Sequence, residues 1–265
     1  MKKLIFLATL LLLQANGYGF TIKKDNSLLD MVGYGNCDMQ TNGEVLCMQQ
    51  RIRCRGMVFD VGANKGQWSK YALGLKPRIT LYSFEPIAPI FEKLKRTLKK
   101  YRNAFTFNLA FSKQAGTKTL FFYDKNQDVT ELSGLYYRPI LDELIGEKPK
   151  QVSIQTDTLD FFCQHHDIHM IDFLKIDTEG SELDILLGAY GLLCQKQIKT
   201  IQFEYGGAYL DSQSTLKQVY DLLSELHYTV YRIIPEGLIE ITEWRDELEI
   251  FQYSNYLATA KPIVY

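Results

Sequence analysis

The sequence predicts a Rossmann-like α/β domain, that is, a mostly parallel sheet with helices on both faces. Three observations predict it. From Met57 onward, short apolar runs alternate with stretches of helical periodicity. The first apolar run leads into a turn with two glycines four positions apart, Gly62 and Gly66, and then into a helix-like stretch. The length of 265 residues and the hydrophobic content of 46% suit one such domain with additions, or at most two small domains.

Apolar patterns place the individual elements along the chain. Runs of apolar or alternating residues predict strands at 57–61, 79–84, 105–111, 120–123, 152–155, 171–176, 200–203, 228–234 and 248–253. Apolar residues at helical spacing predict helices at 87–98, 183–190 and 216–226, and a further helix begins at Gln67.

The N-terminus has the three parts of a secretory signal peptide. Two lysines precede an apolar run at 4–13, and residues 15–17 resemble a small-x-small cleavage site. The run is shorter than the roughly 20 apolar residues that span a bilayer. We therefore expect residues 1–17 to be a signal peptide or an N-terminal anchor, which would be the only membrane contact. The alternatives are a buried helix and a true start at Met31.

Residues 18–51 are rich in Gly, Asn, Gln and Asp and have weak periodicity. This predicts a leader or lid with little structure of its own, followed by the main domain at 52–265. The five cysteines have spacings that match no zinc motif. In an exported chain Cys37 and Cys47 are candidates for a disulfide, and buried free thiols are the alternative.

The charge balance argues against a nucleic-acid partner. The chain has 30 basic and 31 acidic residues and a net charge of −1, whereas nucleic-acid binders usually have a basic excess. His165, His166 and His169 put two imidazoles on one helical face, but no carboxylate or cysteine completes a ligand set. We therefore expect no nucleic-acid partner and no metal site, and the sequence leaves the oligomeric state open.

The first chemical motif is VFDVGANKG at 58–66, where a strand runs into a glycine turn and a helix. Ligands of open α/β sheets bind beyond the carboxyl ends of the strands. A dinucleotide needs G-x-G-x-x-G for its anionic pyrophosphate, whereas this loop is G-x-x-x-G and Asp60 lies near the strand end. A carboxylate is a natural partner for the sulfonium and ammonium groups of S-adenosylmethionine. The motif therefore favours S-adenosylmethionine as the cofactor.

The second motif, SFEP at 83–86, ends the second strand. Glu85 follows Gly66 by 19 residues, at a position where a carboxylate accepts hydrogen bonds from both ribose hydroxyls. Pro86 belongs to the same predicted contact. For both Asp60 and Glu85 the alternative interpretation is helix capping or a surface acid.

The third motif is FLKIDTEGSE at 173–182, an apolar strand that leads directly into acids. Favourable charge at a helix N-terminus explains Glu182 but explains Asp177 less well, because the apolar strand runs straight into it. We therefore predict a site role for Asp177 and Glu179. Glu204 and Tyr205 end the next strand and are predicted to line the acceptor pocket.

Together these motifs resemble the FkbM family of S-adenosylmethionine-dependent methyltransferases. The resemblance covers about residues 52–257 and rests on four stretches in order: VFDVGANKGQWS, SFEP, NLAFS with a glycine after it, and FLKIDTEGSELDILLGA. It implies a class I methyltransferase fold, with a seven-stranded sheet whose last strand is antiparallel. It also implies O-methylation of a hydroxyl on a sugar, glycan, polyketide or similar secondary metabolite.

The resemblance also implies roles for individual residues. The methionine part of the donor would be held by the first loop, namely Asp60, Gly62, Ala63, Asn64 and Gly66. Glu85 would hold the ribose, and the stretch from Asn108 to Ala110 would lie near the adenine. Asp177 and Glu179 would face the sulfonium and the acceptor.

A hydroxyl acceptor must lose its proton as it attacks the methyl group. Asp177 is the preferred general base, Glu179 is the alternative, and Lys175 and Glu204 are expected to assist. Burial of the base would raise its pKa towards a useful range.

Two other functions fit parts of the sequence. An exported binding protein that kept the fold and lost catalysis would explain the signal-like N-terminus, although the acids of all three motifs are intact. A dinucleotide-dependent enzyme is the second alternative. The localisation stays open as well, because the N-terminus favours export whereas a donor made in the cytosol favours the cytoplasm.

Overall fold

The computed structural model describes residues 21–23, 35–125, 128–129 and 132–263. The predicted signal segment at 1–17 and the alternative start at Met31 lie outside these ranges. Within them, no helix combines the length and the apolarity needed to cross a bilayer.

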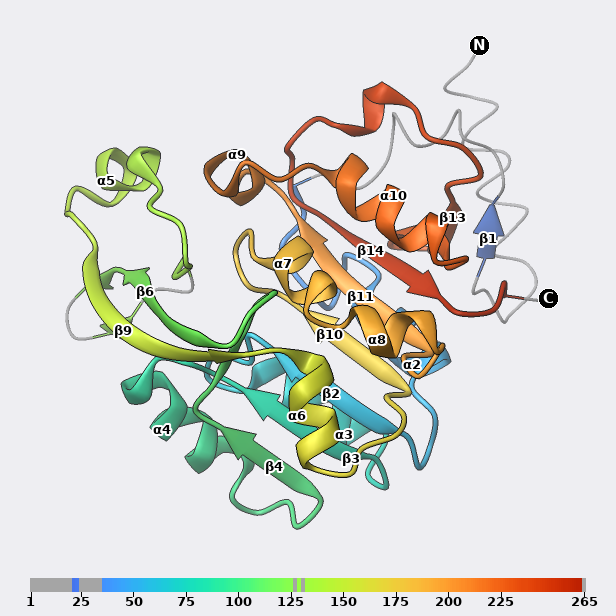
Figure 1. Cartoon of the computed structure of the whole chain (residues 1–265), viewed down its shortest axis with the longest axis horizontal. Helices are drawn as coiled ribbons and strands as arrows, with labels where there is room; N and C mark the ends of the chain where they lie inside the picture. Colours follow the sequence, from blue (N-terminus) through green and yellow to red (C-terminus); the bar gives the residue numbers. More distant parts are fainter. Residues whose placement is uncertain (1–20, 24–34, 126–127, 130–131, 264–265) are drawn as a thin grey trace.

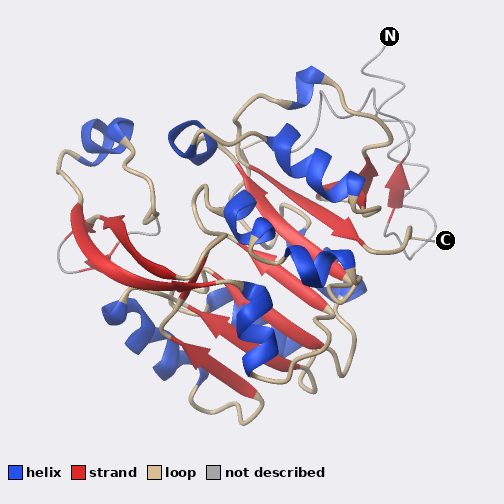
Figure 2. Ribbon diagram, viewed as in Figure 1, coloured by secondary structure: helices blue, strands red, loops and turns tan. Residues whose placement is uncertain are grey.

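One large sheet forms the centre of the described molecule (Figures 1 and 2). Its strands are β1 (Thr21–Lys23), β2 (Met57–Val61), β3 (Thr80–Phe84), β4 (Ala104–Phe107), β10 (Phe173–Ile176), β11 (Thr200–Tyr205), β12 (Thr229–Ile234), β13 (Gly237–Glu240) and β14 (Ser254–Thr259). They lie in the order β1-β13-β12-β14-β11-β10-β2-β3-β4.

The strand directions confirm the expected class I fold. The neighbours from β4 to β11 pair in parallel. The last strand in sequence, β14, lies between β11 and β12 and runs antiparallel to both. The seven strands from β4 to β12 therefore match the expected sheet, and β13 and β1 extend it at one edge.

Helices cover both faces of this sheet. They are α2 (Glu44–Arg51), α3 (Gln67–Leu75), α4 (Ala88–Leu98), α6 (Leu159–His165), α7 (Glu182–Leu187), α8 (Tyr190–Cys194), α9 (Ala208–Ser212) and α10 (Leu216–Glu225). Strand β2 is buried on both sides because Phe59 packs into the core under α6, α7, α8 and α10, while Val58 packs into the core under α2, α3 and α4. This double burial explains the continuous apolar run of a parallel strand.

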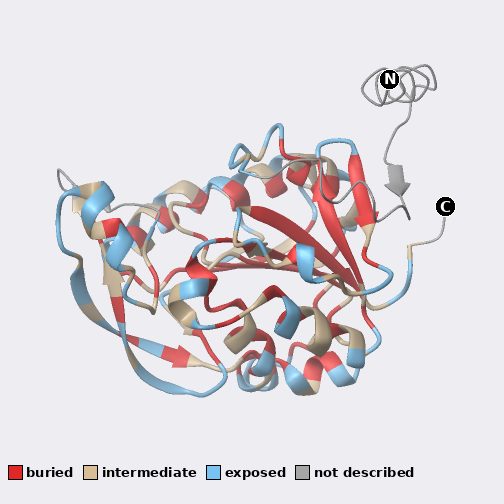
Figure 3. Ribbon diagram, turned by 90° about the horizontal axis from the view of Figure 1, so that it is seen from above, coloured by how far each residue is buried: buried red, intermediate tan, exposed pale blue. Residues whose placement is uncertain are grey.

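A separate arm projects from the sheet, at the left of Figure 1. It runs from β6 (Gly116–Phe122) to β9 (Lys150–Asp157), and β9 pairs with both β6 and β5 (Ala110–Phe111) in a three-stranded sheet. Between them lie β7 (Asp124–Lys125), β8 (Asp128–Val129) and α5 (Pro139–Ile145). Leu120 and Ile154 of the arm pack against Ile87 and Ile90 of the main domain, whereas much of the arm is exposed (Figure 3).

Two strand predictions were wrong in detail. The predicted strand at 105–111 divides after Phe107, and the chain re-enters a strand at Ala110 in the sheet of the arm. The predicted strand at 248–253 is a 3-10 turn, η2 (Asp246–Leu248), and a loop. Its apolar residues pack without strand pairing, and the Glu249 carboxylate accepts hydrogen bonds from the backbone of Leu216 and Lys217, at the start of α10.

The leader is more ordered near its end than the sequence suggested. Within 18–51, α2 forms and buries Cys47 and Met48 completely. Its buried stripe also includes Glu44, and an acid at a buried position masks the helical pattern. The domain boundary at residue 52 stays a prediction. All five cysteines are free, so the structure contains no Cys37–Cys47 disulfide.

Candidate active site

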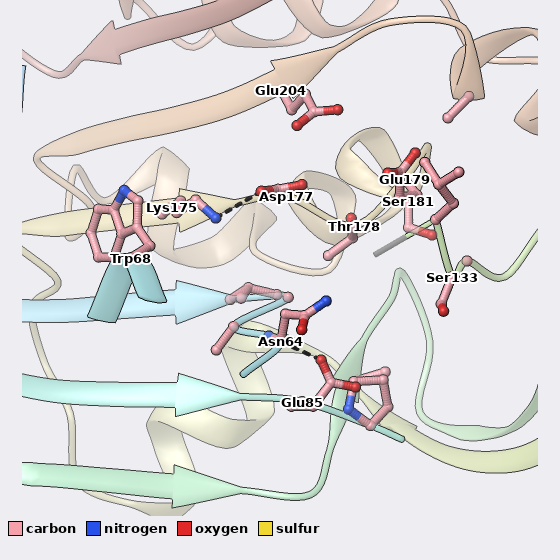
Figure 4. Close-up of a pocket in the computed structure, with 18 of the residues that line it drawn as sticks. Asn64, Trp68, Glu85, Ser133, Lys175, Asp177, Thr178, Glu179, Ser181 and Glu204 are labelled. Carbon is pink, nitrogen blue, oxygen red and sulfur yellow. Dashed lines mark hydrogen bonds and ion pairs between the residues drawn. The ribbon is translucent and has the colours of Figure 1, made fainter. Parts of the chain in front are cut away.

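A cavity of about 610 Å³ opens at the carboxyl ends of β2, β3, β10 and β11 (Figure 4). This is the position at which open α/β sheets bind ligands. Ten of the residues predicted from the sequence line it: Gly62, Ala63, Asn64, Glu85, Pro86, Ala110, Lys175, Asp177, Glu179 and Glu204.

Strand register places a row of polar side chains beside the cavity. Ser83, Asp60, Lys175 and Gln202 are neighbours on β3, β2, β10 and β11. The Ser69 hydroxyl donates to Asp60 Oδ2 at 2.6 Å, and Lys175 Nζ lies 3.7 Å from Asp60 Oδ1. Asp60 is fully buried and does not line the cavity. The expectation that it holds the donor directly is therefore not supported, and its visible partners are Lys175 and Ser69.

Lys175 links this buried row to the cavity. Its Nζ donates to Asp177 Oδ2 at 2.8 Å and lies 5.7 Å from the centre of the Trp68 ring (Figure 4). Burial alone would lower the pKa of Lys175, but the carboxylates of Asp177, Asp60 and Glu44 outweigh it and raise the pKa above its ordinary value. Lys175 therefore stays cationic and orients Asp177; it is not a proton acceptor.

Glu204 lies beside Asp177 at the end of β11. Burial raises its pKa well above the ordinary value, and the nearby Asp177, Glu179 and Glu182 carboxylates raise it further. Figure 4 shows the Glu204 carboxyl group next to that of Asp177. Two carboxyl groups that lie this close disfavour simultaneous ionisation, an arrangement that suits proton transfer.

Glu182 shapes the turn that carries Asp177 and Glu179. Its carboxylate accepts hydrogen bonds from the Thr178 and Gly180 backbone, at 2.8 and 3.0 Å, and from the Thr178 hydroxyl at 3.0 Å. This agrees with the sequence-based view that Glu182 serves a helix N-terminus. Glu179 adopts a left-handed backbone conformation with φ of 54°, and its carboxylate lies 2.5 Å from Arg138 Nη1 of the arm.

Gly62 and Glu85 shape the other half of the cavity. Gly62 has φ of 82°, and a Cβ atom there would lie 1.8 Å from the Asp177 carbonyl oxygen, so only glycine fits. Glu85 accepts hydrogen bonds from the backbone N–H of Asn64 at 3.1 Å and of Ile87 at 2.8 Å. Burial raises the pKa of Glu85 to about 7. A carboxylate has four acceptor sites, so two remain for a ligand.

Three further predicted residues lie outside the cavity lining. Gly66 is at the start of α3, behind the loop. The Asn108 amide donates to the carbonyl oxygens of Glu85 and Pro86 at 2.9 and 2.8 Å, so it holds the SFEP turn. Tyr205 is fully buried and donates to Glu249 at 2.7 Å. Its side chain supports the loop before β14 and does not line the cavity in which a methyl acceptor would bind.

Sequence reasoning missed several lining residues. They are Cys37, Asp38, Met39, Gln40 and Glu44 of the leader, Trp68, Ser181, Tyr253, and Leu132, Ser133, Gly134, Leu135 and Arg138 of the arm. Trp68 could have been found, because it directly follows the glycine loop. The leader and arm residues have no such signal, since only tertiary packing brings them to the strand ends.

Within the described part of the chain, three buried polar atoms of the lining residues lack a hydrogen-bond partner. Arg138 Nε has the Asp211 carboxylate 3.4 Å away as an ion-pair partner, which leaves Trp68 Nε1 and Ser181 Oγ. Buried polar groups are nearly always paired, so these two suit a ligand with polar groups of its own. Ile87, Ile90 and Leu109 form an apolar wall of the same cavity. An apolar wall with a few polar groups suits a nucleoside-bearing cofactor.

The three neighbouring histidines noted in the sequence, His165, His166 and His169, are not arranged as metal ligands. His165 stacks on Phe161 and His166 packs against Phe162, with ring centroids 6.1 and 4.2 Å apart. Across the described ranges no group of three or more His, Cys, Asp or Glu side chains is placed to hold a metal ion.

Comparison with known proteins identifies the family. Residues 60–232 match the family described as "Methyltransferase FkbM domain". The chain belongs to this family. It is a class I methyltransferase whose methyl donor is S-adenosylmethionine, and the cavity residues fit that donor.

Three relatives illustrate the range of the family. The chain is 26% identical over 175 residues to "2-O-methyltransferase NoeI" of Sinorhizobium fredii, covering 63% of this chain and 70% of that protein. It is 28% identical over 160 residues to "31-O-demethyl-FK506 methyltransferase FkbM" of Streptomyces tacrolimicus, covering 52% and 60%. The crystal structure of "Methyltransferase FkbM" from Methylobacillus flagellatus is 15% identical with a TM-score of 0.49, covering 78% of this chain and 44% of that one.

Proposed function

We propose that this methyltransferase methylates a hydroxyl group of a sugar, glycan or secondary metabolite. One observation carries the proposal: the Asp177 carboxylate is fixed by Lys175 at 2.8 Å and adjoins Glu204 in the cavity beside the glycine loop. Such a site removes a proton from a weakly acidic nucleophile. The printed names of two relatives, a 2-O-methyltransferase and a 31-O-demethyl-FK506 methyltransferase, support oxygen as the acceptor atom.

The donor would occupy the half of the cavity that contains Glu85. Gly62, Ala63 and Asn64 would hold its methionine part through the loop backbone, and Glu85 its ribose. Ala110 and the apolar wall would lie beside its adenine. When bound, S-adenosylmethionine supplies a methyl group whose bond to sulfur breaks, with both electrons left on sulfur, as the acceptor oxygen bonds to the carbon.

The acceptor proton would pass to Asp177. Lys175 holds this carboxylate in one orientation, and the Glu204 carboxyl group lies beside it. Because the donor is already activated, the remaining task of the site is to align donor and acceptor. The arm and the leader residues that line the cavity would exclude water during this step.

A labelled donor tests which atom receives the methyl group. The purified chain is incubated with donor carrying a ¹³C-methyl group and a panel of sugars and polyols, and the products are examined by NMR and mass spectrometry. We expect one new methyl group bound to oxygen. A methyl group on nitrogen or carbon would contradict the proposal. Donor binding with no transfer to any hydroxyl compound would favour a binding protein on this fold.

The Glu85→Gln variant is expected to bind S-adenosylhomocysteine about 1.5–3 kcal/mol more weakly, because charge-assisted hydrogen bonds to the ribose are lost. Isothermal titration calorimetry measures this directly. Glu92→Gln, on an exposed part of α4, is the matched control and should bind normally. Equal affinity of the Glu85 variant and the control would refute the ribose contact.

The affinity for S-adenosylhomocysteine should also depend on pH. Burial raises the pKa of Glu85 to about 7, and the ionised form is the better acceptor for two hydroxyl donors. Affinity should therefore rise with pH through about 7 and level off above it. The rise should be absent in Glu85→Gln, which separates it from titration of the ligand itself.

A further inference from the structure

The half of the cavity opposite Glu85 is rich in carboxyl groups. Asp177 and Glu204 lie there on neighbouring strands (Figure 4), and Glu179 and Glu44 line the same side. Two of the four have a cationic partner: Lys175 Nζ is 2.8 Å from Asp177, and Arg138 Nη1 is 2.5 Å from Glu179. Within the described residues neither Glu44 nor Glu204 forms an ion pair of its own with a lysine or arginine, although the charge of Lys175 acts on Glu44 and lowers its pKa.

Glu44 is built into this half of the cavity by three amide side chains. Its carboxylate accepts hydrogen bonds from Asn42 at 2.7 Å, Gln202 at 2.6 Å and Asn255 at 3.2 Å. It is 5% exposed. The chain enters α2 through Gly43, where φ is 99° and a Cβ atom would lie 2.1 Å from the Ile234 carbonyl oxygen. The backbone conformation at Gly43 thus places the Glu44 side chain in its buried position.

Strand register joins Glu44 to Glu204. Asn255, which binds Glu44, is the register partner of Glu204 on β14. Directly opposed residues of an antiparallel pair project to the same face of the sheet. Glu44 and Asn255 both lie outside the 60–232 segment that matches the family. The acidity of this half is therefore partly a property added to the family domain by the flanking segments.

The Ser181 hydroxyl is a further polar group on this side of the cavity. Ser181 is 2% exposed, lines the cavity beside Glu179, and its Oγ has no hydrogen-bond partner within the described residues (Figure 4). A hydroxyl both donates and accepts, so it suits a ligand that presents an N–H or O–H group. Four carboxyl groups that share two cations, Lys175 and Arg138, together with an unused hydroxyl, point to a cationic ligand with polar hydrogens.

We propose that the acceptor carries a protonated amino group near the hydroxyl that is methylated, as in an amino sugar or amino polyol, and that Glu44 and Glu204 select for it. This inference rests on the proposed function and names its substrate class. An anionic acceptor would be repelled by the same groups, and a neutral one would add no positive charge to a half of the cavity in which acids outnumber cations.

The acidic half also explains how such an acceptor would be methylated on oxygen. Carboxylates near an ammonium group stabilise its protonated form. A protonated amine has no free electron pair and does not attack a methyl group. The neighbouring hydroxyl keeps its lone pairs, bonds to the methyl carbon and gives its proton to Asp177, while the electrons of the broken carbon–sulfur bond stay on sulfur. The same carboxyl groups would therefore favour a cationic acceptor and direct the methyl group to its hydroxyl oxygen.

Three hexoses of similar size test the charge preference. Glucosamine, glucose and glucuronate are titrated into the full-length protein saturated with S-adenosylhomocysteine, and the dissociation constants are compared. We expect glucosamine to bind roughly tenfold or more tightly than glucose, because hydrogen bonds between charged groups are the stronger ones. Glucuronate should bind no better than glucose.

Two variants test whether Glu44 and Glu204 cause the preference for glucosamine over glucose. Glu44→Gln and Glu204→Gln keep side-chain size and polarity, and each should reduce the advantage of glucosamine over glucose several-fold. Glu225→Gln removes a charge from an exposed position of α10 and should leave it unchanged. Thermal unfolding checks that each variant is folded, and two separate sites keep the test valid if one variant is unstable.

The outcomes separate this inference from the function on which it rests. If S-adenosylhomocysteine binds but glucosamine shows no advantage, or none of the hexoses binds, the amino-acceptor inference is wrong and the methyltransferase assignment stands. If S-adenosylhomocysteine itself fails to bind, the proposed function fails. A preference that survives in both variants would show that other groups cause it.

Discussion

Replacing Asp177 by Asn is expected to slow methyl transfer by roughly 10²–10⁴-fold, the usual range for loss of a general base. The amide has nearly the shape of the carboxylate and still accepts a hydrogen bond from Lys175, which lies 2.8 Å away. It cannot take a proton from the acceptor. Affinity for S-adenosylhomocysteine should stay within about twofold of wild type, because the donor contacts come from the other half of the cavity. Single-turnover rates and calorimetry give the two quantities.

Glu179→Gln is the matched control for this prediction. Glu179 is paired with Arg138 at 2.5 Å, so the variant should loosen the arm and raise KM while changing the transfer rate by much less than Asp177→Asn. The reverse pattern, with a normal Asp177→Asn and a slow Glu179→Gln, would exchange the two roles. If both variants turn over normally, proton removal by either acid is refuted.

Sequence reasoning predicted which residues meet at the cavity where those residues follow a strand. Asp177 comes directly after β10, Glu204 lies in the last part of β11, and Gly62 follows β2, so parallel pairing brings all three to one edge. The alternation of strands and helices was enough to predict that pairing. The same logic assigned Asp60 to the donor, but Asp60 is in register with Lys175 and lies two positions before the row of Gly62, Asp177 and Glu204, so it stays within the sheet and short of the cavity. Asp60 is in fact buried against Ser69 and Lys175.

The other half of the site has no signal in the local sequence. Glu44 reaches the cavity because Gln202 and Asn255 bind it from strands more than 150 positions away. Arg138 reaches it because the arm folds back onto Glu179. A single sequence shows residue types and spacing along the chain, and neither predicts which distant segment will close a cavity. The leader and arm residues on the acceptor side are therefore ones that sequence reasoning did not identify individually.

Lys175→Met is expected to cost about 3–5 kcal/mol of the free energy of unfolding, because it leaves the fully buried Asp60 without its cationic partner. Burial raises the pKa of Asp60 and Lys175 opposes that rise. Without Lys175 the folded state therefore holds a proton on Asp60 to higher pH than the unfolded chain does. The loss of stability should be smallest at low pH and grow as the pH rises above the ordinary aspartate pKa of about 4.

A second substitution tests this explanation. Adding Asp60→Asn to Lys175→Met removes the buried charge and should recover about 1–3 kcal/mol, with the added pH dependence abolished. Lys95→Met, on an exposed part of α4, should change stability by no more than about 0.5 kcal/mol. Chemical denaturation at several pH values measures all three. Asp60→Asn alone should bind S-adenosylhomocysteine within about twofold of wild type; a folded Asp60→Asn variant that no longer binds it would show that Asp60 holds the donor after all.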